Sequence, residues 1–472
     1  MSGTPARPTA AKARSRAAAS AARSTAGAGS ASGQASAGQG TPAGWGGSGT
    51  QAPGSAAPPA AAAWPAAPAR SAHAHASVAA SRRIDGCIAG RWYHRRVERC
   101  DVLVVGGGPG GSSAAWGLRG SGLDVVICDR QRFPRDKVCA GWITPQICAE
   151  LTLEPEGYAK EHLIQPIRGF AVSRQGDATA TAEYGQVVSY GIRRCEFDHH
   201  LLERSGARMR LGAPPSDLRR EGGRWVLDGE LSARWLVGAG GHFCPVARHL
   251  GARPGAGEPA TVVAREIEFE MTPAQQARCR VRADLPELFF TRDLRGYGWV
   301  VRKGDWLNVG LGRQDPRGFA RHVEAFLDWL VATGKAPPDL PRGLRGHAYL
   351  LYDQAPRPLA AEGVLLVGDA AGLAYGRSGE GIRPAVESGL LAARALRAAF
   401  AEVGGEGPER AYARALTARF GPRRGRMRRG PSDWLPRRWR GPLAGRLLAS
   451  SWFARRVVVD RWFLHRDAPA LA

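Results

Sequence analysis

Short apolar runs separated by small-residue segments mark the middle of the chain. Residues 101–105 (DVLVV) and 123–129 (LDVVICD) are rich in β-branched side chains and predict two buried strands. Between them, residues 112–118 (SSAAWGL) predict the start of a helix. Further on, residues 364–367 (VLLV) predict another buried strand, and the Ala/Leu-rich residues 384–400 predict a long helix. Strands and helices that alternate in this way favour an α/β fold with a parallel sheet.

A different pattern marks two segments between these runs. Residues 262–269 and 299–311 alternate apolar and polar side chains, which favours an antiparallel sheet with one covered face. Residues 401–466 are expected to be helical and to cap a chamber. The predicted fold class is therefore α/β with an α+β second domain and a helical C-terminal cap.

Length, charge and cysteine content exclude several classes of protein. The chain has 472 residues, enough for two or three domains, and 44% of them are hydrophobic, enough for a sizeable core. Its net charge of +24 lies mainly at the two ends. No run of 18 apolar residues predicts a membrane-spanning helix. The eight cysteines form no CxxC pair or tight cluster, which argues against metal sites and disulfides and fits reduced thiols in a cytosolic protein.

The N-terminal segment, residues 1–84, contains no acid and consists mostly of Ala, Gly, Ser, Pro and Thr with scattered Arg. This composition predicts a disordered tail, because it offers too little apolar surface to offset the entropy of ordering. Organelle transit peptides have a similar composition, and a start codon placed too early is another alternative. The positive charge could attract nucleic acid, but no interleaved aromatic residues support such a partner.

The C-terminal end combines arginine with aromatic side chains. Arg and Trp on one segment suit peripheral contact with an anionic membrane surface, where indole rings rest at the headgroup level. The alternative is a solvated basic face whose tryptophans pack onto the core, and prolines at 431, 436 and 442 interrupt any helical period. The residues concerned are Arg423, Arg424, Arg426, Arg428, Arg429, Arg437, Arg438, Arg440, Trp434, Trp439, Trp452, Trp462 and Phe463.

A glycine-rich turn follows the first predicted strand. Gly106, Gly108 and Gly111 form a GxGxxG pattern between strand and helix, and Asp129 ends the next strand 18 residues after Gly111. This spacing predicts a dinucleotide-binding loop, in which glycines admit the pyrophosphate, the helix N-terminus offers free amides and the acid binds ribose hydroxyls. The alternative is a glycine-rich hairpin or linker.

A second corner indicates which dinucleotide is bound. Gly368 and Asp369 follow the strand 364–367, where a carboxylate can reach a ribityl hydroxyl, a group that nicotinamide dinucleotides lack. Gly379, Gly381 and Ile382 open the long helix, where bare amides suit the flavin N1/C2 edge that gathers negative charge on reduction. The predicted cofactor is therefore FAD, although a strand–turn–helix with a capping Asp would give the same local pattern.

Four further stretches complete a family pattern. They are FPRDKVCAG (133–141), RCEFD (194–198), VGAGG followed by PVAR (237–241 and 245–248), and GYGWVVRKG with NVGLG (296–304 and 308–312). With the two glycine-rich corners they resemble FAD-dependent oxidoreductases of the geranylgeranyl reductase-like group, within the p-hydroxybenzoate-hydroxylase-type flavoprotein superfamily. The resemblance covers about 99–400 and is expected to run to 466.

The resemblance implies how the chain is organised. It implies a Rossmann-like FAD-binding domain of discontinuous segments, an antiparallel-sheet substrate domain and a helical cap. The boundaries expected are 1–98 for the low-complexity tail; 99–165, 190–255 and 356–400 for the FAD-binding domain; 166–189 and 256–355 for the substrate domain; and 401–472 for the basic C-terminal region.

The resemblance also implies roles for single residues. Cys139 would lie near the reactive face of the flavin, where it could gate the pocket or pass a proton, and the neighbouring cations Arg135 and Lys137 would lower its pKa if they lie close. Tyr297 and Trp299, with Phe289 and Phe290 upstream, would form one wall of an apolar chamber. The alternative for each is ordinary core packing. The full set expected to bind FAD is Gly106, Gly108, Gly111, Asp129, Arg130, Arg135, Lys137, Arg194, Gly368, Asp369, Gly379, Gly381 and Ile382, with Arg194 on the phosphates or the adenosine.

Two departures from the family pattern bear on the reaction. Gly240-Gly241 stands where the superfamily has Asp-Gly, which weakens the inference that NAD(P)H donates a hydride directly, so the electron donor is NAD(P)H or a reductase partner. Val301-Arg302 replaces Phe-Pro of YxWxFP, and the WxWxIP pattern of tryptophan halogenases is absent, which argues against a halogenase.

The reaction expected is hydride transfer from reduced FAD to carbon–carbon double bonds of an isoprenoid or other apolar substrate. The alternative is a monooxygenase acting on an aromatic or polyketide-like substrate, and a third is a nucleic-acid- or membrane-binding protein with a vestigial flavin fold. Cys139, Tyr297 or a water molecule are the candidate proton donors, and no His or Glu is singled out. The sequence predicts no metal site, favours a cytoplasmic protein with peripheral membrane contact, and leaves the oligomeric state open.

Overall fold

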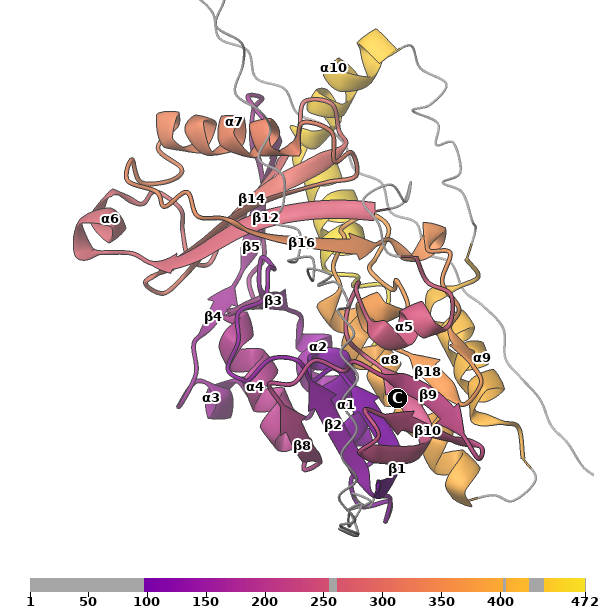
Figure 1. Ribbon diagram of the computed structural model, residues 1–472. Coiled ribbons are helices and arrows are strands. Elements are labelled where there is room, and N and C mark those ends of the chain that lie inside the picture. The colour runs from indigo at the N-terminus through magenta and orange to yellow at the C-terminus, as the bar shows by residue number, and fades with distance from the viewer. Residues whose placement is uncertain (1–96, 254–260, 402–404, 424–436, 472) are drawn as a thin grey trace, which may run out of the picture. The chain divides into compact units, whose positions relative to one another are not determined.

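The computed structural model describes residues 97–253, 261–401, 405–423 and 437–471, with the side chains of 437–440 left out (Figure 1). All of them belong to one compact unit, Ala89–Ala472. The expectations for the tail 1–96 and for the basic residues 424–436 lie outside the described residues.

A largely parallel sheet contains the predicted apolar runs. Strands in the middle of a parallel sheet are buried on both faces. Their sequences are therefore almost continuously apolar. The strand order is β17 (Ala360–Ala361), β18 (Val364–Leu366), β11 (Leu231–Gly238), β1 (Glu98–Val105), β2 (Val125–Asp129) and β8 (Arg208–Leu211), and all neighbours except β17 and β18 are parallel. An antiparallel hairpin of β9 (Leu218–Glu221) and β10 (Arg224–Leu227) adds to β11.

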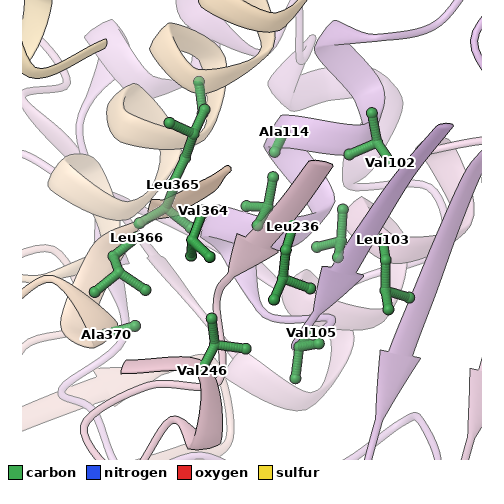
Figure 2. Close-up of a cluster of buried hydrophobic side chains, with 14 of the residues drawn as sticks. Val102, Leu103, Val105, Ala114, Leu236, Val246, Val364, Leu365, Leu366 and Ala370 are labelled. Atoms are coloured by element: carbon green, nitrogen blue, oxygen red, sulfur yellow. The ribbon is translucent and has the colours of Figure 1, made fainter. Parts of the chain in front are cut away.

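Helices α1 (Pro109–Gly117), α4 (Arg194–Arg204), α8 (Ile382–Ala401) and α9 (Pro408–Phe420) pack around this sheet. Helices α1 and α8 approach so closely that a Cβ on Gly389 of α8 would lie 2.3 Å from the carbonyl oxygen of Gly110 in α1. Glycine at position 389 therefore permits the contact. Figure 2 shows the apolar core between strands and helices, with Val102, Leu236 and Leu365 among the side chains at its centre. The parallel α/β half predicted from the sequence is therefore confirmed.

A second, mostly antiparallel sheet carries the region that alternates in sequence. Its order is β16 (Arg345–Leu350), β12 (Thr261–Glu270), β15 (Trp306–Arg313), β14 (Gly296–Lys303), β13 (Glu287–Phe290), β5 (Gly169–Arg174) and β6 (Ala180–Glu183), with β13 and β5 the one parallel pair. A third sheet joins β3 (Trp142–Ile143), β7 (Ser189–Ile192) and β4 (Ile164–Ile167). The antiparallel second half of the predicted fold is likewise confirmed.

The expectation that this sheet has one covered face is wrong for its central strands. Val300 and Val309 pack against helix α7 (Phe319–Ala332) on one side, while Trp299 and Val301 face a second apolar cluster on the other. Strands β14 and β15 therefore have no exposed residue, and most of their residues are buried. Phe289 packs against α7, with its ring 6.0 Å from that of Phe326, so it does not belong to the expected chamber wall.

The C-terminal region is helical where it is described, as the sequence predicts. It contains α9, α10 (Arg437–Leu448), α11 (Ser451–Phe453) and the π-helix η4 (Ala454–Phe463). Phe463 of η4 is fully buried and its ring lies 5.2 Å from that of Tyr297 on the second sheet. None of the helices in the described ranges is long and apolar enough to cross a membrane. The remaining short helices are α2 (Pro145–Glu150), α3 (Pro155–Tyr158), α5 (Pro245–His249), α6 (Pro273–Arg278), η1 (Tyr352–Gln354) and η2 (Gly368–Ala370).

Candidate functional site

One cavity of about 340 Å³ joins the two glycine-rich corners, a volume within the ~300–1,000 Å³ of small-molecule sites. Its lining includes Gly106, Gly108 and Gly110 after β1, Gly368 and Asp369 after β18, and Tyr297 and Trp299 of β14. The two corners, more than 250 residues apart in sequence, therefore belong to one continuous space between the parallel sheet and the second sheet.

The first corner is shaped by backbone that only glycine permits. Gly106 has a φ of +116°, and a Cβ there would lie 2.3 Å from the Ala239 carbonyl oxygen. A Cβ on Gly111 would lie 1.9 Å from the Gly106 carbonyl oxygen, so Gly111 allows strand and helix to touch although it does not line the cavity. Helix α1 begins after Gly108 without a side-chain cap, which leaves its first amides free for an anion.

Charged side chains surround this corner. The Asp129 carboxylate accepts hydrogen bonds from the amides of Gly107 and Gln131, each at 2.8 Å, and lines the cavity together with Arg130. Arg135 lies over the turn, since a Cβ on Gly108 would come within 3.4 Å of its Nη2 atom. Cations and free amides beside an acid that could accept hydrogen bonds from ribose hydroxyls fit a dinucleotide pyrophosphate.

At the second corner Asp369 has partners that the sequence did not reveal. His347 Nε2 lies 3.1 Å from Asp369 Oδ2, and Lys137 Nζ lies 2.9 and 2.8 Å from the two ring nitrogens of His347. These neighbours hold the pKa of Asp369 at about 2, against the effect of burial. Burial and Lys137 lower the pKa of His347 to about 4, so its imidazole is neutral at pH 7.

Cys139 lies on the cavity wall and is held by its backbone. Its amide donates to the Glu266 carboxylate, and its carbonyl accepts from Asn308 Nδ2 at 3.1 Å. Burial raises the pKa of the thiol, and this outweighs the opposing effect of Arg194. The thiol therefore does not have the lowered pKa expected if Arg135 and Lys137 lay close to it, because burial disfavours the charged thiolate more than the nearby Arg194 favours it.

Arg194 is placed beside Cys139. Its Nε and Nη2 atoms each lie 2.7 Å from a carboxylate oxygen of Asp198, which Arg135 also approaches within 3.1 Å. The side chain is buried and lines the cavity. The Arg194 guanidinium is paired with the Asp198 carboxylate and lies beside the Cys139 thiol. The expected contact of Arg194 with the phosphates or the adenosine of FAD stays a prediction.

Tyr297 and Trp299 lie on the cavity side of β14, and each is fixed by one hydrogen bond. The Tyr297 hydroxyl donates to the Ser378 carbonyl at 2.5 Å, and Trp299 Nε1 donates to Asn308 Oδ1 at 2.7 Å. Gly379, Gly381 and Ile382 also line the cavity. Because the Tyr297 proton is already committed to a backbone oxygen, Tyr297 is better suited to shape the wall than to donate a proton.

The structure adds two buried acids that the sequence analysis did not single out. Burial raises the pKa of Glu266 to about 8 and that of Glu380 to about 7. Glu380 stands between two predicted flavin-binding glycines in GRSGEGI, so its position alone could have marked it. Glu266 and Glu268 lie two residues apart in the strand sequence AREIEFE, so their side chains point to the same face of the strand. Two acids on one face of a predicted strand could also have marked these positions.

Comparison with known proteins agrees with these features, although no family model matches the chain. Digeranylgeranylglycerophospholipid reductase of Methanocaldococcus jannaschii is 26% identical over 305 residues, which cover 62% of this chain and 75% of that protein. Menaquinone reductase of Mycobacterium tuberculosis is 32% identical over 327 residues, which cover 63% of this chain and 77% of that protein. The chain belongs to the geranylgeranyl reductase-like group of FAD-dependent oxidoreductases.

Solved structures show the same fold. A geranylgeranyl bacteriochlorophyll reductase-like protein of Thermoplasma acidophilum superposes with a TM-score of 0.62 at 21% identity, covering 75% of this chain and 92% of that one. The flavin-dependent halogenase CmlS superposes with a TM-score of 0.52 at 22% identity, covering 68% of this chain and 62% of that one. Membership of the geranylgeranyl reductase-like group makes the protein an FAD-dependent oxidoreductase, and its reductase relatives favour reduction over the monooxygenase alternative.

Proposed function

We propose that this oxidoreductase reduces carbon–carbon double bonds in a polyprenyl chain. Menaquinone and digeranylgeranylglycerophospholipid, the molecules in the names of two relatives, both carry such chains. The observation that carries the proposal is the apolar wall of Trp142, Tyr297 and Trp299, which shares one cavity with both glycine-rich corners and with Cys139. An alkene placed against that wall would share the cavity with the proposed cofactor site and the Cys139 thiol.

The residues present fit FAD. We propose that Asp129 binds ribose hydroxyls, that the first amides of α1 with Arg130 and Arg135 bind the phosphates, and that Asp369 binds a ribityl hydroxyl. The remaining residues proposed for FAD binding are Gly106, Gly108, Gly111, Lys137, Arg194, Gly368, Gly379, Gly381 and Ile382. When bound, FAD supplies two-electron chemistry in which a hydride is accepted and passed on.

The chain's own residues supply orientation and protons. The apolar wall of Trp142, Tyr297 and Trp299 would keep water away from a substrate packed against it. Cys139 keeps its proton at neutral pH, because burial raises its pKa, and its backbone is fixed by Glu266 and Asn308. We propose Cys139 as the residue that passes a proton to the substrate carbon next to the one that receives the hydride.

The test combines flavin stoichiometry with single-turnover product analysis. Purified protein is expected to contain about one FAD per chain, and dithionite-reduced protein mixed anaerobically with menaquinone or a digeranylgeranyl lipid is expected to reoxidise. The product should gain 2 Da and lose one prenyl alkene signal by NMR. A quinol that reverts in air would place the reduction on the quinone ring, and oxygen incorporation would restore the monooxygenase alternative. Parallel reactions with NADH, NADPH and dithionite identify the electron donor.

We further propose that the C-terminal helices contact an anionic membrane that contains the substrate. Leu443 and Leu447 of α10 are 43% and 41% exposed, and Trp452 of α11 is 69% exposed. Arg446 and Arg455 are exposed nearby, so apolar and cationic side chains share this surface. Part of the predicted set is turned inward, because Arg423 donates to the carbonyls of Ala355 and Ala371 and Phe463 is buried.

Vesicle flotation tests this contact. Binding to vesicles with phosphatidylserine should exceed binding to phosphatidylcholine vesicles, should fall with salt, and should weaken at least about fivefold in Trp452→Ala. Arg317→Ala removes a cation that is 91% exposed and that lies just before α7, outside the C-terminal helices, and it serves as the control. Equal binding by W452A and the wild type would contradict the proposed contact.

A further inference from the structure

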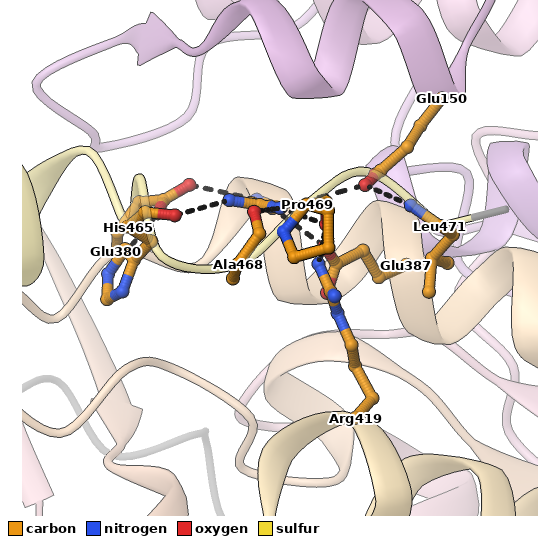
Figure 3. Close-up of polar contacts among 9 residues, drawn as sticks. Glu150, Glu380, Glu387, Arg419, His465, Ala468, Pro469 and Leu471 are labelled. Atoms are coloured by element: carbon orange, nitrogen blue, oxygen red, sulfur yellow. Dashed lines mark hydrogen bonds and ion pairs between the residues drawn. The ribbon is translucent and has the colours of Figure 1, made fainter. Parts of the chain in front are cut away.

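The irregular segment His465–Leu471 crosses the molecule beside helix α8 and is pinned there by buried charges (Figure 3). Arg383 is fully buried, and its guanidinium donates to the carbonyls of His465 at 3.3 Å and Ala468 at 2.7 Å. At the other end the Leu471 amide donates to Glu150 at 3.0 Å. Two fixed ends leave His465 little freedom to move away from the cavity.

His465 has an uncommon backbone and a fixed ring. Its φ of 46° is left-handed, a conformation that non-glycine residues rarely adopt and that is concentrated at functional sites. Its imidazole stacks on the Tyr375 ring with centroids 3.7 Å apart. Nε2 lies 3.4 Å from Ser378 Oγ and 4.0 Å from Glu380 Oε2. The C-terminal segment therefore places an imidazole against the cavity loop 375–381.

Glu380 is the acid of that loop. Its side chain is 7% exposed, and one carboxylate oxygen accepts from the Arg383 amide at 3.0 Å. The other oxygen, Oε2, is buried without a hydrogen-bond partner among the described residues. An unpartnered buried oxygen is costly unless the carboxyl holds a proton or another group supplies one.

The charged groups around the pair set its protonation. Burial and Glu387 raise the pKa of Glu380 to about 7, opposed by Arg383, while Tyr375 and Tyr297 face it as neutral phenols. Burial, Arg383 and Arg419 lower the pKa of His465 to about 4, opposed by Asp467. At pH 7 the imidazole is thus neutral, and the carboxyl is close to half ionised.

We propose that Glu380 and His465 form a proton-uptake site coupled to the redox state of the bound FAD, an inference that rests on the proposed function. Reduction adds two electrons from the electron donor to the cofactor, and the added negative charge makes the ionised fraction of the Glu380 carboxyl bind a proton from solvent. Reoxidation by the substrate removes that charge and the proton leaves. His465 relays it between Glu380 and the exposed side of the segment, because a neutral imidazole accepts at one nitrogen and donates from the other.

Spectroelectrochemical titration of the flavin-loaded full chain from pH 5.5 to 8.5 measures the protons bound per two electrons. At pH 7 the wild type should bind about half a proton more than Glu380→Gln, since a group with a pKa of about 7 is half ionised before reduction. Glu150→Gln is the matched control, because Glu150 is also buried and holds the same segment but does not line the cavity. It should keep the wild-type proton count.

The relay is tested by His465→Gly, since glycine accepts the left-handed backbone. Proton uptake after rapid reduction, followed with a pH dye, should slow at least about tenfold, and added imidazole should restore it. Restoration by imidazole is a response that a merely structural role would not give. No effect of imidazole on H465G would overturn the relay.

Three outcomes separate this inference from the proposed function. Flavin-loaded E380Q with the wild-type proton count overturns the inference alone. Protein that binds no flavin contradicts the proposed function instead. If E380Q loses its flavin, Glu380→Asp keeps an acid at a different distance and should shift the pH at which the extra proton is bound, and an unshifted value would again overturn the inference.

Discussion

Cys139 depends on side chains that lie far from it in sequence. Glu266 and Asn308 hold its backbone from two strands of the second sheet, and Arg194 approaches its thiol from α4. These contacts fix the position of Cys139, while burial, which outweighs the opposing effect of Arg194 on the pKa of the thiol, keeps the sulfur in its neutral form. A neutral thiol is suited to give up a proton in a step that creates charge elsewhere, whereas a thiolate would be suited to nucleophilic attack.

Replacing Cys139 tests that distinction. Cys139→Ala should lower the single-turnover rate of alkene reduction by about 10²–10³, the usual contribution of a placed general acid, while FAD content stays at the wild-type level. Cys139→Ser keeps a proton on a hydroxyl and should recover part of the rate. Stopped-flow reoxidation of the reduced flavin measures both. A wild-type rate in C139A would exclude the thiol as proton donor.

Gly111 tests the first corner by geometry alone. Gly111→Ala would bring a Cβ to 1.9 Å from the Gly106 carbonyl oxygen, so strand and helix must move apart. We expect the variant to purify with less than about one-tenth of the wild-type FAD, read from absorbance at 450 nm, since the turn and the free amides shift together. Gly185→Ala is the control, because a Cβ at Gly185 would have no neighbouring atom within 4 Å, and this variant should keep the wild-type FAD content. A yellow G111A protein would show that the turn tolerates the movement.

At the residue scale, the local motifs predicted one residue of each contact in the site but not the distant residue that it contacts. The glycines, Asp129, Asp369 and Cys139 were identified because each stands in a pattern of a few neighbouring residues. Their partners were not, because His347 is separated from Lys137 by 210 residues and Glu266 from Cys139 by 127. No local pattern specifies which distant strand will deliver a side chain, so the contacts of the buried acids and of the neutral histidine required the folded chain.

At the scale of elements, hydrophobic period predicted which segments form strands and helices but not what covers them. The runs 101–105 and 364–367 became β1 and β18, and the long helix expected at 384–400 became α8. Alternation in β14 was read as one exposed face, yet the other face is closed by the C-terminal helices, which lie more than 140 residues further along the chain. The covering element could not be read from the strand itself.

Replacing Phe463 tests how much the packing of the C-terminal helices on the second sheet contributes to the free energy of unfolding. Phe463→Ala removes a fully buried ring that packs on Tyr297 and Trp142, and should lower the free energy of unfolding by about 3–5 kcal/mol. Trp452→Ala, on the same C-terminal segment but 69% exposed, should change it by less than about 0.5 kcal/mol. Urea unfolding of both variants makes the comparison. Equal losses would mean that the segment does not close the chamber through Phe463.

At the scale of the whole molecule, buried titratable groups of two kinds oppose each other. His242, His347 and His465 have pKa values lowered by burial to about 4, so the folded chain keeps them neutral where the unfolded chain would charge them. Stability therefore rises with pH between about 4 and 6.5. Glu266 and Glu380 have pKa values raised by burial to about 8 and about 7, so their contribution is complete below about 4.5 and is lost as pH rises through those values. The contributions of these five groups, taken by themselves, are jointly most favourable near pH 6.5.

Glu266→Gln tests how much Glu266 contributes to the fall in the free energy of unfolding as the pH rises. In the wild type the folded state keeps the Glu266 proton that the unfolded chain has already released, so each pH unit between about 4.5 and 8 removes about 1.4 kcal/mol. Glutamine does not ionise, and the free energy of unfolding of E266Q should therefore fall by ~2 kcal/mol less than that of the wild type between pH 6 and 8. Glu270→Gln, exposed on the same strand β12, should follow the wild type. Parallel declines of E266Q and the wild type in urea titrations would mean that Glu266 is ionised throughout, and the amide of Cys139 would then be bound to a carboxylate in a wetter site than the structure describes.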